Sequence, residues 1–312
     1  MAIVIEILLL AVGFVLLVKG ADWFVEGASG IADKLRIPQL VIGLTIVAMG
    51  TSAPEAAVSI TAALGGCADI SIGNVVGSNI LNILIILGIS SVITSIAVSK
   101  TTVRYEIPIM LAATALLAVF GMTDGYVVLW EGIVLLLLFA AYLFYMFVMV
   151  KRGEMQAEEV ESNQRPVWLL ILMGVVGLAL VIWGSDITVD SATALAETFG
   201  MSEKFIGLTV VALGTSLPEL FTSVVAARKG KADIAIGNIV GSNIFNILLI
   251  IGITGLIIPV PFEVSFLVDC IIAAAAGVLL WLCVFRKKKL KLADGIIMLV
   301  SYAAYFVYLL VK

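Results

Sequence analysis

Long apolar runs, separated by glycine, proline or charged residues, divide the chain into segments of similar length. A helix needs about 20 apolar residues to cross the hydrocarbon core of a bilayer. By that criterion the pattern predicts an all-α integral membrane protein with ten membrane-spanning helices, at roughly residues 3–30, 38–64, 70–97, 105–121, 126–149, 167–197, 204–227, 233–258, 264–284 and 292–311.

Composition supports the membrane prediction. Hydrophobic residues make up 62% of the 312 positions and charged residues only 13%, about half the charged share of a soluble domain. This excludes a soluble enzyme, a nucleic-acid binder and a disordered protein. The chain has no His, so it lacks an imidazole metal ligand. Because no nucleophile–base constellation is visible either, we expect neither an enzyme nor a bound cofactor.

Basic residues predict how the chain is oriented. If the N-terminus lies outside the cell, about fifteen of the 18 Lys and Arg residues fall in loops on the inner side. Cytoplasmic loops are enriched in Lys and Arg, so we expect both termini outside a plasma or inner membrane. The same count makes the polar stretch 151–165 a cytoplasmic linker. The inner basic residues lie within 34–36, 100–104, 151–165, 228–231 and 286–291.

The chain also contains a long internal repeat. Residues 42–89 align without a gap onto 206–253, and about 32 of the 48 positions are identical. We therefore expect a five-helix repeat at 1–150, the linker at 151–165 and a second five-helix repeat at 166–312. Five is an odd number of crossings, so the second repeat enters the membrane from the opposite side. Such inverted repeats are typical of secondary transporters, whose sites lie near the bilayer midplane.

The first repeated motif is Gly-Thr-Ser-Ala-Pro-Glu, which ends at Glu55, matched by Gly-Thr-Ser-Leu-Pro-Glu, which ends at Glu219. Proline lacks an N–H and crowds the carbonyl of the fourth residue before it. Each motif therefore predicts a kink in mid-span, with free carbonyl oxygens around 48–51 and 212–215. Residues four apart share a face of a helix, so Thr51 lies above Glu55 and Thr215 above Glu219.

A carboxylate at mid-membrane costs roughly 2.5–3.5 kcal/mol on insertion scales, so two at equivalent positions require a reason. Carboxylate, hydroxyl and carbonyl oxygens are the ligands of hard cations such as Ca2+. The alternative is that each Glu is protonated and bonds a neighbouring helix. Taken singly, Thr51, Ser52, Thr215 and Ser216 could instead bond back to their own backbone.

The second repeated motif places polar residues at spacing four. Asn74, Ser78 and Asn82 form one stripe, and a matching stripe recurs in the second repeat at Asn238, Ser242 and Asn246. The stripe can supply ligands, or it can pack helices through hydrogen bonds between them. Four acidic residues near helix ends also allow two interpretations: they are solvated at the interface or cap the helices, or they take part in ion access. They are Asp22, Glu26, Asp186 and Asp190.

These paired motifs resemble the two alpha-repeats of the cation/calcium exchanger superfamily, in particular the prokaryotic sodium/calcium exchangers. The resemblance covers essentially the whole chain. It implies that Glu55 and Glu219 are central carboxylates shared by Ca2+ and Na+, flanked by Asn82 and Asn246. It further implies backbone or side-chain oxygen ligands at Thr51 and Thr215, Na+ ligands at Ser52, Ser216, Ser78 and Ser242, and backbone carbonyl ligands at Ala48 and Ala212.

The predicted function is Na+/Ca2+ antiport by alternating access at a midplane site between the repeats. The expected partners are Ca2+, Na+ and the lipid bilayer, with no nucleic acid and no evident protein partner. Some family members carry Asp at the position of Asn246, whereas here both flanking residues are Asn. Ion stoichiometry and K+ dependence therefore stay open. A Ca2+/H+ antiporter and a K+-dependent exchanger of the same fold are the alternatives, and a cation channel is a remote one.

Overall fold

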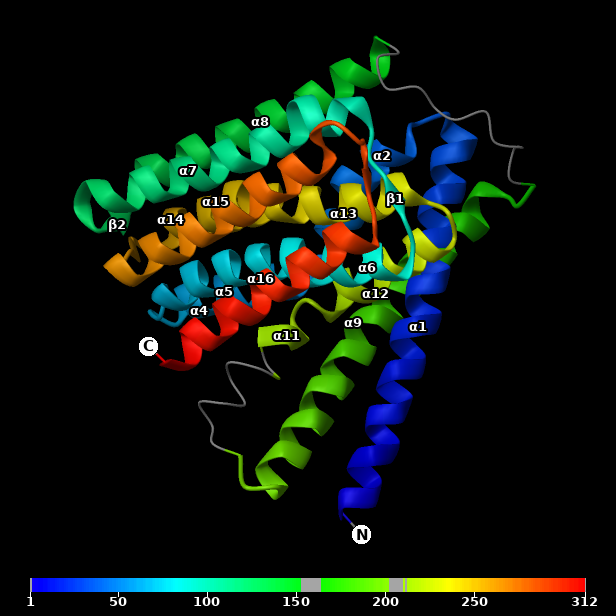
Figure 1. Cartoon of the computed structure of the whole chain (residues 1–312), viewed down its shortest axis with the longest axis horizontal. Helices are drawn as coiled ribbons and strands as arrows, with labels where there is room; N and C mark the ends of the chain where they lie inside the picture. Colours follow the sequence, from blue (N-terminus) through cyan, green and yellow to red (C-terminus); the bar gives the residue numbers. More distant parts are fainter. Residues whose placement is uncertain (1, 153–163, 202–209, 211, 312) are drawn as a thin grey trace.

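A computed structural model describes residues 2–152, 164–201, 210 and 212–311, and nearly all of them are helical (Figure 1). The 151–165 linker and the predicted span at 204–227 lie partly outside these residues. The elements of the first half are α1 (Ala2–Leu35), α2 (Gln39–Ile42), η1 (Gly43–Val47), α3 (Ala48–Thr51), α4 (Ala53–Leu64), α5 (Asp69–Leu81), η2 (Asn82–Leu87), α6 (Gly88–Ile93), β1 (Ile96–Ala97), η3 (Thr102–Glu106), α7 (Ile107–Asp124), β2 (Tyr126–Val127) and α8 (Leu129–Lys151).

The second half follows the same order. Its described elements are α9 (Val167–Thr198), α11 (Ala212–Gly214), α12 (Leu217–Arg228), α13 (Ala232–Phe245), η5 (Asn246–Ile251), α14 (Gly252–Ile257), β3 (Val260–Pro261), α15 (Val264–Phe285), β4 (Lys289–Leu290) and α16 (Leu292–Val311). Over the described residues, eight helices are long and apolar enough to cross a membrane, and the bent pair Gln39–Thr51 and Ala53–Leu64 makes a ninth.

A helix break is present just before each proline. The helix axis turns by 48° between Thr51 and Ala53, because Ser52 leaves the helical region at φ −82° and ψ 10°. Pro54 then lies in the first turn of α4, where its missing N–H costs nothing. Ser216 and Pro218 repeat this arrangement at the start of α12. The break places a carboxylate, Glu55 or Glu219, in the first turn of each new helix.

Wider π-helical turns interrupt the spans at equivalent places. The segments η2 and η5 begin at Asn82 and Asn246, which the repeat aligns. π-Turns often mark functional positions. Hydrophobic periodicity does not reveal them, because a single extra residue in one turn changes the pattern very little.

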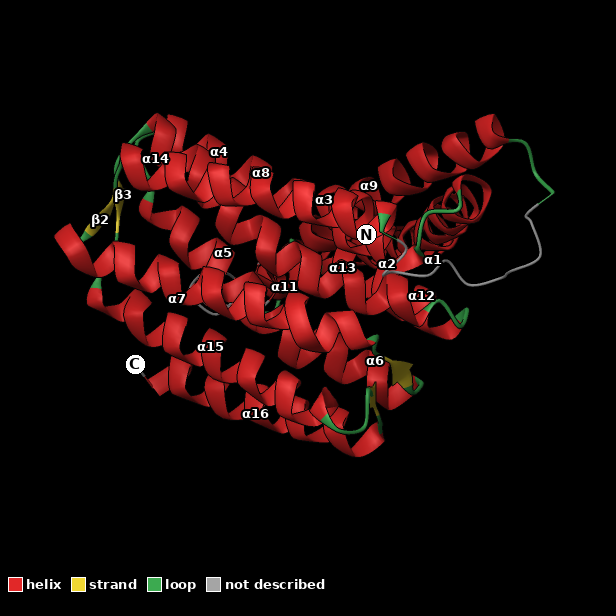
Figure 2. Cartoon of the chain, turned by 90° about the horizontal axis from the view of Figure 1, so that it is seen from above, coloured by secondary structure: helices red, strands yellow, loops and turns green. Residues whose placement is uncertain are grey.

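The two halves are interleaved. β1 pairs antiparallel with β4 and β2 with β3, so short loop strands join one half to the other, a small departure from the all-α prediction. Seen from above (Figure 2), α5 and α13 lie between α8 on one side and α16 on the other. Every residue of α13 from Ile234 to Phe245 is buried. The motif helices therefore form the core, and the longer apolar helices surround them.

Helices α1 and α9 pack against each other along much of their length and extend away from this core (Figure 1). Their contact depends on glycine. A Cβ added at Gly177 would lie 2.4 Å from the backbone nitrogen of Phe24, and one at Gly20 would lie 2.8 Å from the carbonyl oxygen of Gly177. A Cβ at Gly184 would meet the carbonyl oxygen of Gly13 at 2.9 Å. The two backbones thus touch without intervening side chains.

Candidate cation site between the two halves

Glu55 and Glu219 are fully buried, and each is bonded by a serine from the other half. Ser216 Oγ donates to Glu55 Oε1 at 3.2 Å, and Ser52 Oγ donates to Glu219 Oε1 at 2.8 Å. Both serines occupy the helix breaks, three residues before the glutamate of their own half. This crosswise exchange brings the four side chains together across the interface between the halves.

Four buried oxygens near this interface make no hydrogen bond to any described residue: Glu55 Oε2, Glu219 Oε2, Asn82 Oδ1 and Asn246 Oδ1. α4 packs against η5 and α12 against η2, so each glutamate's helix lies beside the asparagine of the other half. An unpaired buried acceptor costs about 1–3 kcal/mol. Two carboxyl and two amide oxygens match the preference of a hard cation.

A chain of asparagine side chains holds the two neutral oxygens. Asn82 Nδ2 donates to Asn243 Oδ1 at 3.0 Å, and Asn246 Nδ2 donates to Asn79 Oδ1 at 3.1 Å. Asn79 Nδ2 and Asn243 Nδ2 each donate to the other residue's backbone carbonyl, both at 3.1 Å. Each of these bonds has a counterpart at the equivalent positions of the other half. Asn79 and Asn243 lie in the second repeated motif, where the sequence left helix packing and a functional role equally open, and they were not among the predicted ligands.

Other polar side chains of the two motifs, those of Thr51, Asn74 and Asn238, form hydrogen bonds within the protein. Thr51 Oγ1 donates to Asn238 Oδ1 at 2.9 Å and is also within reach of the Val47 carbonyl of its own helix at 3.1 Å. Asn74 Nδ2 donates to the Glu55 carbonyl at 3.1 Å, and Asn238 Nδ2 to Ser223 Oγ at 3.0 Å. Thr51 therefore makes the bond to its own helix that the alternative interpretation expected, and a bond across the interface as well.

The expectation of free backbone carbonyls is wrong at two positions. The Ala48 carbonyl accepts from the Ser52 amide at 3.0 Å and from Ser242 Oγ at 3.4 Å. The Gly214 carbonyl accepts from Ser185 Oγ at 2.8 Å, because α9 brings a hydroxyl to the break that local sequence could not reveal.

The remaining predicted ligands are less completely described. Ser78 is buried and Thr215 is half-buried. Ala212 begins α11, and its side chain lies outside the described residues.

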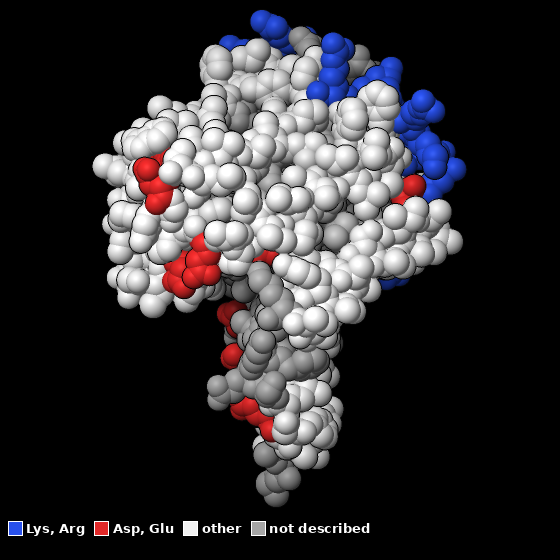
Figure 3. Space-filling model, turned by 60° about the vertical axis from the view of Figure 1, so that its left-hand side comes forward, with Lys and Arg blue, Asp and Glu red and all other residues white. Residues whose placement is uncertain are grey.

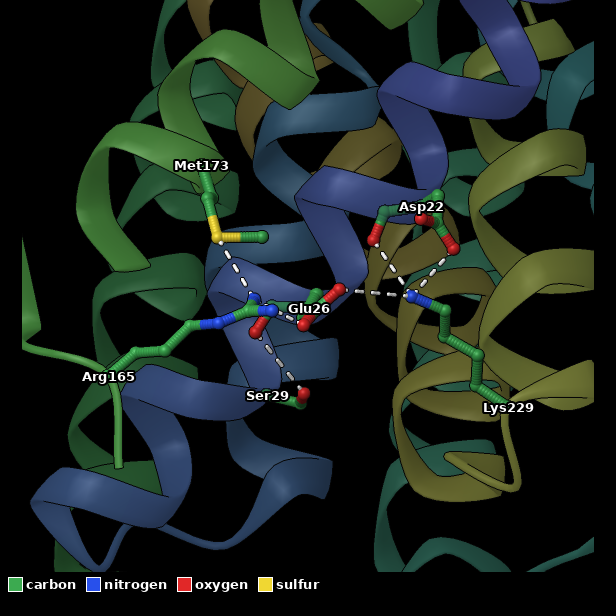
Figure 4. A network of polar contacts seen from close by, with 6 residues as sticks. All are labelled: Asp22, Glu26, Ser29, Arg165, Met173 and Lys229. Carbon is green, nitrogen blue, oxygen red and sulfur yellow. Dashed lines mark hydrogen bonds and ion pairs between the residues drawn. The ribbon is translucent and has the colours of Figure 1, made fainter. Parts of the chain in front are cut away.

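A second polar network lies along the C-terminal half of α1 (Figure 4). Lys229 Nζ, at the end of α12, lies 2.6 Å from Asp22 Oδ1 and 3.5 Å from Glu26 Oε2. Arg165, just before α9, pairs with Glu26. Asp22 and Glu26 therefore tie α1 to two other elements. At the positions the repeat equates with Asp22 and Lys229, the chain carries Asp186 and Gly65.

Comparison with known proteins agrees with this architecture. The profile of the sodium/calcium exchanger protein family matches residues 5–148 and 169–311. A putative antiporter, CaxA of Alkalimonas amylolytica, is 41% identical over 94% of this chain and 95% of its own length. The sodium/calcium exchanger MaX1 of Methanosarcina acetivorans is 33% identical over 98% of this chain and 99% of its own.

A solved structure of the sodium-calcium exchanger NCX_Mj, soaked without Na+ and Ca2+, superposes with a TM-score of 0.86. It is 34% identical and covers 98% of this chain and 99% of its own. These relatives are exchangers or, for CaxA, a putative antiporter. This chain is therefore a multi-pass membrane protein that belongs to the sodium/calcium exchanger family of cation/Ca2+ exchangers.

Proposed function

We propose that the protein exchanges Ca2+ for Na+ at a site built around Glu55 and Glu219. The observation that carries the proposal is the set of four buried oxygens without hydrogen-bond partners in the described chain, two of them on these carboxylates. The relatives MaX1 and NCX_Mj are a sodium/calcium and a sodium-calcium exchanger, which supports Na+ as the counter-ion.

The ligand set would extend outward from these four oxygens. Ser52 and Ser216 contact the carboxylates directly. A cation between the glutamates can therefore reach their hydroxyl oxygens with little movement. We assign the remaining ligand positions to Thr51, Thr215, Ser78, Ser242 and the carbonyls of Ala48 and Ala212. A carbonyl oxygen has two lone pairs, so the Ala48 carbonyl can bind a cation while it keeps one of its bonds.

Charge neutralisation explains the coupling. Two ionised glutamates give the site a charge of −2, which one Ca2+ or two Na+ would cancel. An uncompensated charge in a medium of low dielectric constant is costly, so the site resists crossing the membrane without ions. A third Na+ would give the loaded site a net charge of +1. Moving that charge is worth about 2.3 kcal/mol per 100 mV, so three-for-one exchange would depend on voltage.

Two inverted five-helix repeats would provide the two access states, with the polar stretch 151–165 joining them. In this proposal the α1–α9 pair slides against the core, because a glycine-lined contact holds the two helices together as one unit. The Lys229 ion pairs tie that unit to the end of α12 and favour closure on that side.

Orientation follows from charge. Figure 3 shows Lys and Arg gathered at the end of the molecule where α1 finishes. Most of the acidic residues in this view lie away from that end. By the enrichment of basic residues in cytoplasmic loops, we assign that end to the cytoplasm and both termini to the outside. The Lys229 network then lies on the cytoplasmic side.

The test is 45Ca2+ uptake into proteoliposomes preloaded with Na+. We expect uptake that needs an outward Na+ gradient and disappears when choline replaces Na+ inside. Uptake driven by a pH gradient in the absence of Na+ would identify a Ca2+/H+ antiporter instead. A requirement for K+ on the Ca2+ side would identify the K+-dependent exchanger. Flux without any counter-ion would indicate a channel.

A further inference from the structure

We propose that Asn79 and Asn243 are positioning residues, which fix the amide orientation of Asn82 and Asn246 so that the site presents oxygen to the cation and no N–H group. The proposal rests on the proposed function, because it concerns the same site. Neither residue carries one of the four unpartnered oxygens, and both act through a neighbour.

A backbone carbonyl oxygen can only accept a hydrogen bond, so it fixes the orientation of an amide that faces it. The Asn243 carbonyl oxygen lies 3.1 Å from the Asn79 side chain, so the atom facing it must be the Nδ2 donor. The other terminal atom of Asn79 is then Oδ1, which can only accept. It lies 3.1 Å from Asn246, so Asn246 must present Nδ2 to it. The Asn246 oxygen is thereby left outside the chain of hydrogen bonds.

The second half repeats each step. The Asn79 carbonyl accepts from Asn243 Nδ2 at 3.1 Å, and Asn243 Oδ1 accepts from Asn82 Nδ2 at 3.0 Å. Each acceptor sets the orientation of the amide that donates to it. Two backbone carbonyls thus determine four side-chain orientations. Each pair spans the interface, because Asn79 controls Asn246 of the other half and not Asn82, three residues away on its own helix.

The chemistry of the site follows from this arrangement. A free amide can turn by 180° and exchange its oxygen for an NH2 group at small cost, and an NH2 group repels a cation. The asparagine chain makes that turn costly, because oxygen would then face oxygen at Asn79 or Asn243.

A purely structural role makes a different prediction, and a double-mutant cycle distinguishes the two. Asn79→Leu removes the acceptor with little change in volume, and Asn246→Ala removes the amide that it orients. Two quantities are measured: the Ca2+ concentration for half-maximal 45Ca2+ uptake, and the shift in melting temperature of the purified protein on adding Ca2+. The second readout needs no Na+ coupling, so it remains informative if the proposed counter-ion is wrong.

We expect each single variant to weaken the apparent Ca2+ affinity about tenfold. The double variant should also lose about tenfold, the same as one single variant, because Asn79 acts only through Asn246. The matched control pairs Asn79→Leu with Asn82→Ala, whose effects should multiply to about a hundredfold, since Asn79 does not orient Asn82. The proposal is overturned if the effects of Asn79→Leu and Asn246→Ala on Ca2+ affinity multiply, or if those of Asn79→Leu and Asn82→Ala do not. If Asn79→Leu does not fold, the mirror-related cycle of Asn243→Leu with Asn82→Ala tests it, with Asn246→Ala as its control.

Discussion

Replacing Glu219 by Gln isolates the charge of one carboxylate. The amide oxygen can still accept from Ser52, which donates to Glu219 Oε1 at 2.8 Å, so the crosswise contact survives. The unpartnered Oε2 becomes an NH2 group. The side chain keeps its shape and loses one negative charge, so the fold should be little affected while cation binding suffers.

The size of the effect follows from Coulomb's law. Two unit charges about 4 Å apart interact by about 4 kcal/mol at an effective dielectric constant of about 20, so the doubly charged Ca2+ is attracted by about 8 kcal/mol to one carboxylate. Desolvation of the ions offsets part of this attraction. If it offsets about half, and since about 1.4 kcal/mol is a factor of ten in affinity, losing one carboxylate should weaken Ca2+ binding by about three orders of magnitude. Glu55→Gln should do the same, because the two-fold relation gives Glu55 an equivalent environment.

The assay is 45Ca2+ uptake into Na+-loaded proteoliposomes over a range of Ca2+ concentrations. Glu106→Gln is the matched control. Glu106 is also fully buried, its Oε1 accepts from Tyr145 at 2.8 Å, and its Oε2 has no hydrogen-bond partner among described residues. It belongs to η3, away from the helix breaks, so this variant should transport normally. Undiminished uptake by Glu219→Gln or Glu55→Gln would refute the assignment of the site.

Three further variants test other parts of the argument. Ser52→Ala removes the hydroxyl that contacts Glu219 Oε1 and that the family resemblance assigns to Na+. If such a contact with a charged group is worth about 1.5–3 kcal/mol, the Na+ concentration needed for half-maximal 45Ca2+ uptake should rise about ten- to a hundredfold; an unchanged Na+ requirement contradicts a role for the serine. Gly177→Ala should slow transport and lower the melting temperature, because its Cβ would lie 2.4 Å from a backbone nitrogen, whereas Gly174→Ala, with no described atom within 4 Å, should do neither. Lys229→Met should change the uptake rate less than about fivefold, because half-exposed ion pairs contribute about 0–1 kcal/mol; a larger loss would give the pair a role beyond favouring one state.

The sequence by itself determined the features that depend on local chemistry. Apolar runs predicted the helix boundaries: eight long helices and the bent pair begin and end within a few residues of nine predicted spans, while the run at 204–227 begins outside the described residues. Pro54 and Pro218 predicted the helix breaks, because a missing N–H acts on the residue four positions earlier whatever surrounds it. The internal repeat identified Glu55 and Glu219 as a pair, since a costly residue placed twice at equivalent positions calls for a common reason.

Only the tertiary structure decided which side chains meet. The crosswise bonds of Ser52 and Ser216 join residues more than 160 positions apart, and Asn79 and Asn243 control each other's neighbours across the same interface. The periodicity of one helix says which face a residue occupies but not which helix covers that face. Orientation of an amide, occupancy of a carbonyl and the partner of a buried acid all depend on that second helix, so they are properties of the assembled fold.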